Sequence, residues 1–162
     1  MKRWLVAALC LWPSLAWATA GESEISAGVA AGRSAELWSA GIDAQYLYDW
    51  TDFWALGASV HDRRLLSDLP HGGSAVAADL RYALDALTFV PSVGAAVGAA
   101  VGSGGVAPFL RAEASLGYRP SRAWGLTVHV GAEQESVSAW APRWTAGLAF
   151  TWYRGAGIGL DL

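Results

Sequence analysis

Residues 75–85 read Ala75-Val76-Ala77-Ala78-Asp79-Leu80-Arg81-Tyr82-Ala83-Leu84-Asp85. Two kinds of side chain alternate along this stretch. One parity is apolar: Val76, Ala78, Leu80, Tyr82 and Leu84. The other parity carries every charge: Asp79, Arg81 and Asp85. Neighbouring side chains of a β-strand point to opposite faces, whereas an α-helix repeats about every 3.6 residues. The pattern therefore predicts a strand with one apolar and one polar face.

The same alternation recurs along the chain and predicts eight strands. We expect them at 24–32, 37–48, 53–63, 75–85, 87–101, 106–118, 124–133 and 143–153. Asp62 is the only charged residue on an apolar parity within these ranges, and we place it at a rim. Short segments of alternating hydrophobicity separated by turns are typical of a transmembrane β-barrel.

The stretch 87–110 has a second interpretation. It carries no charge, and its glycines recur at every fourth position from Gly94 to Gly102, which is the spacing of a transmembrane helix contact. Pro91 and Pro108 interrupt such a helix, and the apolar residues of 87–101 follow period 2. We therefore expect a strand here.

Composition limits the class of protein. The chain has 162 residues, 54% of them hydrophobic and 15% charged, against roughly 25% charged in an ordinary soluble domain. This length leaves no room for a two-domain enzyme. The formal net charge is -3 and Lys2 is the only lysine, so we expect no nucleic-acid partner, because binding phosphates needs clustered basic residues.

The first twenty residues have the features of a secretory signal peptide. Lys2 and Arg3 precede an apolar run, and small residues at Ala18 and Ala20 offer two cleavage sites, of which we prefer Ala20. We assign 1–20 to the signal peptide and 21–162 to one barrel domain. The alternative is an uncleaved N-terminal anchor. Cys10, the only cysteine, lies in the removed segment, so the mature chain has no disulfide, thiol nucleophile or cysteine zinc site.

Connections of two kinds alternate between the predicted strands. Short turns are expected at 49–52, 85–86 and 119–123. Longer or looser connections are expected at 33–36, 64–74, 102–105 and 135–142. Outer-membrane barrels have short periplasmic turns and longer external loops, so a periplasmic N-terminus puts every connection on the expected side.

Aromatic residues collect on apolar parities near the short turns. We predict an aromatic girdle at the membrane surface that contains Tyr46, Tyr48, Trp54, Tyr82, Tyr118, Trp124 and Trp152. Trp38 and Trp144 mark the opposite rim.

On these features the chain resembles the small eight-stranded outer-membrane barrels of the OmpA/OmpX type. The resemblance covers 22 to about 153, and the stretch 81–91 is similar to a hairpin common in uncharacterised members. It implies an all-β, antiparallel, up-and-down transmembrane barrel in the bacterial outer membrane. Lipid and the assembly machinery would be its partners. Such barrels usually end in an aromatic residue, whereas this chain ends in Leu162, so the last strand either runs to Leu162 or stops near Arg154.

The inward parity collects ionisable residues of both signs: Asp43, His61, Arg63, Asp79, Arg81, Arg111, Glu113, His129 and Glu133. Side chains can fill an eight-stranded barrel, so we expect an internal ionic network that plugs the lumen. A narrow channel is the first alternative.

A lipid A-modifying enzyme of the acyl hydrolase type is the second alternative. His129 and Ser136 lie close in the chain, but Gly131 stands where a His-x-Ser pair needs serine. We predict no catalytic, metal or cofactor-binding residue, and hence a structural or interaction protein without enzymatic activity. A soluble periplasmic barrel similar to a lipocalin is the third alternative.

The long connections have two interpretations: packing over the barrel mouth, which we favour, and a contact surface for an external ligand. Residues 64–74 and 135–142 carry apolar side chains that could bind a surface partner: Leu65, Leu66, Leu69, Trp140 and Pro142.

Overall fold

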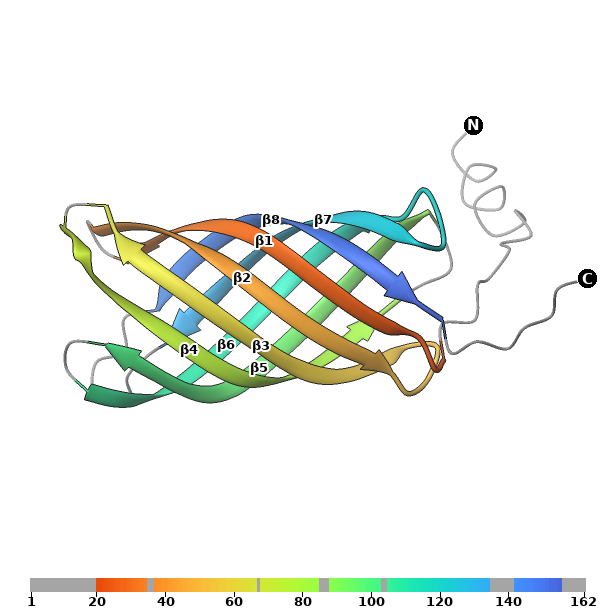
Figure 1. Cartoon of the computed structure of the whole chain (residues 1–162), viewed down its shortest axis with the longest axis horizontal. Helices are drawn as coiled ribbons and strands as arrows, with labels where there is room; N and C mark the ends of the chain where they lie inside the picture. The colour runs from red at the N-terminus through yellow and green to blue at the C-terminus, as the bar shows by residue number, and fades with distance from the viewer. Residues whose placement is uncertain are drawn as a thin grey trace, which may run out of the picture.

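Eight antiparallel strands close into a barrel in chain order (Figure 1). The computed structural model describes residues 20–34, 37–66, 68–84, 88–102, 105–134 and 142–155, with the backbone alone at 68–71. The strands are β1 Ser23–Ser34, β2 Leu37–Asp49, β3 Trp54–Leu65, β4 Asp68–Ala83, β5 Phe89–Gly102, β6 Gly105–Tyr118, β7 Trp124–Gln134 and β8 Arg143–Arg154. The predicted fold class is confirmed.

Pairing of β1 with β8 closes the sheet. The ladder runs from Ser23 opposite Arg154 to Arg33 opposite Trp144. β1 therefore begins and β8 ends at one end of the barrel, which we call the inner end; the opposite end is the outer end (Figure 1). Among the described residues, no helix is long and apolar enough to cross a membrane.

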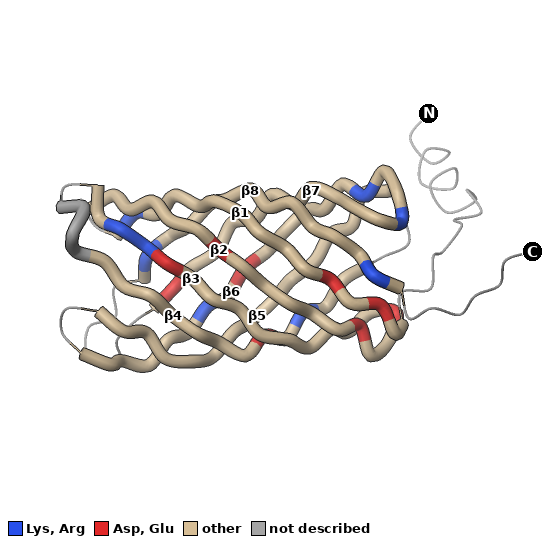
Figure 2. Tube along the Cα trace, viewed as in Figure 1, with Lys and Arg blue, Asp and Glu red and all other residues tan. Residues whose placement is uncertain are grey.

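The two faces of the barrel wall have opposite chemistry. Val97 on β5 points outward and is 61% exposed, whereas its neighbour Ala96 points into the lumen and is 5% exposed. Figure 2 shows how sparse charged residues are along the strands. An apolar outer face around a polar interior is the reverse of a soluble barrel, so the outer face is built for contact with lipid.

β4 begins seven residues earlier than predicted, at Asp68 instead of Ala75. The expected external loop at 64–74 is therefore wrong, because 68–74 belongs to the β3–β4 hairpin. The register shifts between Arg64, opposite Gly72, and Leu65, opposite Asp68. This bulge leaves 69–71 without residues opposite them, and a bulge both tolerates Pro70 and breaks the alternation that sequence reasoning relies on.

The expected contrast between short and long connections is also wrong. At the outer end, two residues join β1 to β2, β3 to β4, and β5 to β6. Only the connection at 135–142 is longer. Leu66 is exposed at the tip of the β3–β4 hairpin. Several residues and segments named in the sequence predictions lie outside the described residues: 1–19, Asp85, Ser136, Trp140 and 156–162.

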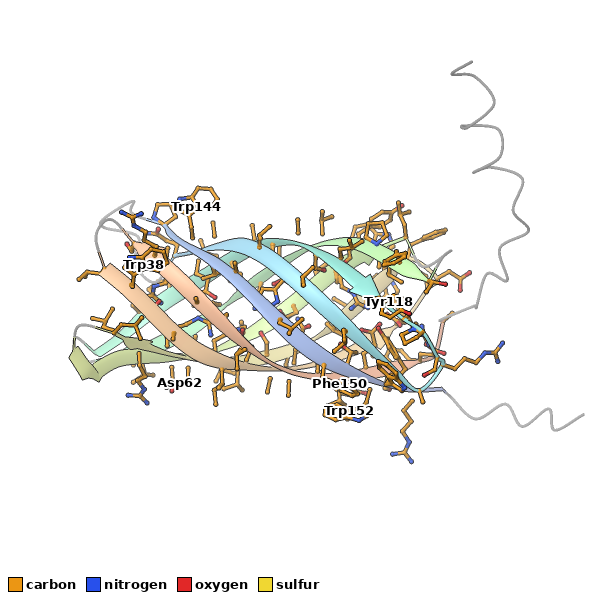
Figure 3. All side chains as sticks on the ribbon, turned by 90° about the horizontal axis from the view of Figure 1, so that it is seen from above. Trp38, Asp62, Tyr118, Trp144, Phe150 and Trp152 are labelled. Atoms are coloured by element: carbon orange, nitrogen blue, oxygen red, sulfur yellow. The ribbon has the colours of Figure 1, made fainter. Side chains whose placement is uncertain are left out.

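The predicted girdle residues lie on the outer face near the inner end. Tyr46, Tyr48, Trp54, Tyr118, Trp124 and Trp152 are exposed, and Tyr82 is half-buried. Figure 3 shows Tyr118 and Trp152 at this end, with Trp38 and Trp144 at the other. Ring pairs link neighbouring strands: Trp54 with Tyr82 at 5.1 Å, Phe89 with Tyr118 at 5.2 Å and Trp124 with Phe150 at 5.7 Å between centroids.

The outer face generates a depth-dependent prediction. Val128 lies near the middle of β7 and points outward, so Val128→Arg should lower the free energy of unfolding in lipid vesicles by about 2–4 kcal/mol. Val106 points outward near the outer end, where Val106→Arg should cost about 0–1 kcal/mol. Urea-unfolding titrations measure both variants, and equal losses would contradict the assigned depths.

Candidate functional site in the barrel lumen

The lumen contains the polar side chains of the inward parity. The nine predicted residues Asp43, His61, Arg63, Asp79, Arg81, Arg111, Glu113, His129 and Glu133 all take part in ion pairs or histidine–carboxylate contacts there. Their alternation within the strands turns them away from lipid. Some of their partners lie on the same or a neighbouring strand, as for Arg63 and Asp43, and others lie on distant strands, as for Arg63 and Glu133.

Arg63 lies at the centre of the outer half of this network. Its Nη1 donates to Asp43 at 2.6 Å, and its Nη2 donates to Glu133 at 2.9 Å. Arg63 is on β3 and Glu133 is on β7, four strands apart in a ring of eight, so this pair crosses the barrel. Arg143 from β8 approaches the other oxygen of Glu133 at 3.8 Å.

Arg111 on β6 connects a second group of residues. Its Nη2 donates to Asp79 at 2.9 Å, and Gln45 donates to the same carboxylate oxygen at 3.1 Å. The Nε of Arg111 lies 3.5 Å from Glu113. These contacts tie β2, β4 and β6 together through side chains.

A third group at the inner end contains residues that sequence reasoning missed. Arg81 donates to Glu24 through both terminal nitrogens and lies 3.4 Å from Asp49. Arg119 donates to Glu22 at 2.8 Å, and its guanidinium lies 3.8 Å from the ring centre of Tyr153. Glu24 and Tyr153 lie at the ends of predicted strands, whereas Glu22, Asp49 and Arg119 lie one or two residues beyond them.

Small residues on the wall make room for larger groups in the lumen. Phe109 packs against Ala75, Ala77, Ala96 and Ala100, and stacks on His61 with ring centres 5.4 Å apart. Gly147 lies opposite His129 in the β7–β8 ladder, and a Cβ atom at position 147 would collide with the imidazole ring of His129. The glycine and alanine positions therefore determine where the bulky groups fit.

Two small cavities remain between these groups. One of about 50 Å³ is lined by residues that include Asp43, His129 and Arg81, and one of about 30 Å³ lies toward the inner end beside Tyr153. Asp43 Oδ2 and Arg81 Nε are buried without a hydrogen-bond partner among the described residues. Such polar space suits a few water molecules.

Ser59, His61 and Asp43 form a linear chain of hydrogen bonds that sequence reasoning also missed. Ser59 Oγ lies 2.8 Å from His61 Nε2, and Asp43 Oδ1 lies 2.7 Å from His61 Nδ1. A hydrolase also needs substrate access and donors for an oxyanion. Ser59 is buried, so a substrate has no access to its hydroxyl group. The β3 backbone around Ser59 is paired with β2 and β4, so its N–H groups are not available to an oxyanion. The arrangement therefore serves packing better than catalysis.

The described part of the chain contains no group of side chains that is arranged as a metal site. There, no three or more His, Cys, Asp or Glu side chains converge in a way that could hold a metal ion. Both lumenal histidines contact Asp43 instead.

Breaking the pair that crosses the lumen should be costly. Glu133→Ala leaves Arg63 with one buried partner fewer and should lower the free energy of unfolding by about 3–5 kcal/mol. Asp62→Ala breaks an exposed pair with Arg64 and should cost about 0–1 kcal/mol. Urea unfolding in detergent micelles measures the difference; similar losses would show that Arg63–Glu133 does not act as a buried tie.

Comparison with known proteins places the fold. No family model matches the chain, and no curated protein matches its sequence. Among solved structures, the N-terminal barrel domain of Pseudomonas aeruginosa OprF is similar, with TM-score 0.63, 16% identity, and coverage of 83% of this chain and 98% of that one. Outer membrane protein OprG from P. aeruginosa has TM-score 0.58, 12% identity, and coverage of 85% and 98%.

Ail, the attachment invasion locus protein of Yersinia pestis, has TM-score 0.51, 16% identity, and coverage of 83% and 99%. At these identities the likeness concerns the fold. The chain has the fold of the small eight-stranded outer-membrane barrels.

Proposed function

We propose that this protein is a structural barrel of the bacterial outer membrane with a closed lumen. The observation that carries the proposal is the Arg63–Glu133 pair, which crosses the barrel between buried side chains. Phe109 and His61 stack on each other in the lumen, and His61 shares Asp43 with Arg63. A lumen occupied in this way blocks the passage of solutes while it braces the wall.

The surface of the barrel supports placement in the outer membrane. Its outer face is apolar between two aromatic rims, and its interior is polar, as lipid on the outside requires. Ail is named as an attachment protein, and attachment to an external ligand would be a more specific role for this chain than a structural one. With two-residue connections elsewhere at the outer end, that role would depend mainly on 135–142.

A narrow channel is the second candidate function, and the two lumenal cavities favour it. The cavities share Glu24 and Arg81 in their linings, so they adjoin each other in the inner half. A channel would also need a path for ions through the outer half of the lumen, where Arg63, Asp43 and Glu133 lie.

Folding and conductance together test the proposal. The full chain in detergent should migrate as a folded, heat-modifiable band and, in planar bilayers, should give no current above background. Arg63→Ala/Glu133→Ala should introduce measurable current, while Asp62→Ala/Arg64→Ala, which removes an exposed pair on the outer face, should not. Stable single-channel currents from the wild type would refute the closed lumen, and recovery as a soluble protein without detergent would refute the membrane barrel.

A further inference from the structure

Charges on the outer face are confined to few places. Among the described strand side chains, the outward charges are Arg33, Asp62 and Arg64 near the outer end and Arg154 at the inner end. The first three belong to β1 and β3, which are separated only by β2. The outer end of the lipid-facing surface therefore has one charged sector, and a charged group on that surface is tolerated at headgroup depth.

Arg33 lies between two exposed tryptophans. It pairs with Trp38 across the β1–β2 ladder and with Trp144 across the β1–β8 ladder. Its guanidinium carbon lies 5.4 Å from the ring centre of Trp38. Trp38 is 52% exposed and Trp144 is 67% exposed, and both stand at the outer end in Figure 3. Indole rings favour the membrane–water interface, so they fix the depth of the Arg33 guanidinium.

Arg64 presents a second guanidinium in the same sector. Its Nε and Nη2 both donate to Asp62 at 3.0 Å, and Ser74 Oγ donates to Asp62 at 2.7 Å. The Arg64 side chain is 48% exposed, against 28% for Asp62. The carboxylate is thus covered by its donors, and the positive group is the more accessible member of the pair. A guanidinium has five N–H donors, of which these bonds use two.

Small residues separate the two arginines. Ala31 on β1 and Ala40 on β2 lie in the row that contains Arg64, and Arg33 lies two residues farther along β1. With strands about 4.8 Å apart and a rise of about 3.4 Å per residue, the two Cα atoms are about 12 Å apart. Because Ala31 and Ala40 have short side chains, the long side chains of Arg33 and Arg64 can extend over them and contact the same headgroup.

We propose that Arg33, Arg64, Trp38 and Trp144 form a binding site for the phosphate-bearing headgroup of a membrane lipid. The inference rests on the proposed membrane location. Guanidinium groups bind phosphate oxygens through paired, charge-assisted hydrogen bonds, and the two indoles supply the interfacial contact for the rest of the headgroup. Within this sector, Asp62 is the only outward acid among the described strand side chains, and its donors cover it. Among these described side chains, the exposed guanidinium groups are therefore more accessible to an anion than the carboxylate is.

Thermal titration of the folded full chain with defined lipids tests the site. The probe is bisphosphorylated lipid A in neutral detergent, and the readout is the midpoint of the heat-induced gel shift as lipid concentration rises. The wild-type midpoint should rise, and Arg33→Gln should weaken the apparent affinity by about tenfold or more. Asp62→Asn/Arg64→Gln, which removes the ion pair as a unit, should do the same. Arg154→Gln, an outward arginine at the other end, is the matched control and should bind as the wild type does.

The other arms identify the source of the phosphate. Fully dephosphorylated lipid A and inorganic phosphate alone should leave the wild-type midpoint unchanged, and Arg33→Lys should retain more affinity than Arg33→Gln. Stabilisation by inorganic phosphate to the same extent would overturn the lipid assignment, and equal stabilisation by the dephosphorylated lipid would overturn the phosphate assignment. Lipid-independent midpoints in a protein that still shows the heat shift would overturn the site and leave the barrel intact. Absence of the heat shift in the wild type would refute the barrel itself.

Discussion

Backbone hydrogen bonding in lipid is the constraint on which this structure depends. Hydrocarbon offers no partner to a free N–H or C=O group, so a sheet can cross it only when its first and last strands pair. The β1–β8 ladder meets that requirement from Ser23 to Arg33. Closure then fixes two faces, because alternate side chains must point to lipid or into a narrow lumen. The apolar outer face and the crowded polar interior both follow from it.

The backbone ladders join neighbouring strands, and lumenal side chains also join distant ones. Arg63 and Glu133 connect opposite walls, and Arg81 and Glu24 connect β4 to β1. Buried ion pairs gain little net stability over well-packed apolar groups, but losing one partner is expensive. A lumen filled in this way specifies the barrel's cross-section more than it adds to its stability, and Gly147 and the alanines around Phe109 set the shape into which these groups fit.

Sequence periodicity could predict the strands and the direction of their side chains, because a period of two is a local property. It could not predict partners such as Arg63 and Glu133, which are 70 residues apart and meet only after closure. It failed at Asp68–Ser74, where the bulge beside Arg64 breaks the period. Glu24, the first residue of a predicted strand, was left out of the predicted lumenal set, and Asp49 was missed because it lies one residue beyond a predicted strand.

The aromatic ring pairs near the inner end have a consequence for how the barrel closes. Turns there connect β2 to β3, β4 to β5 and β6 to β7, while ring pairs bridge β3–β4, β5–β6 and β7–β8. The Ser23–Tyr46 hydrogen bond does the same for β1 and β2. At the β8–β1 junction, where Trp152 faces Ile25, neither a turn nor one of these ring pairs joins the strands. This junction depends on its backbone ladder and on the Glu22–Arg119–Tyr153 contacts, and a barrel that assembles from hairpins would close there last.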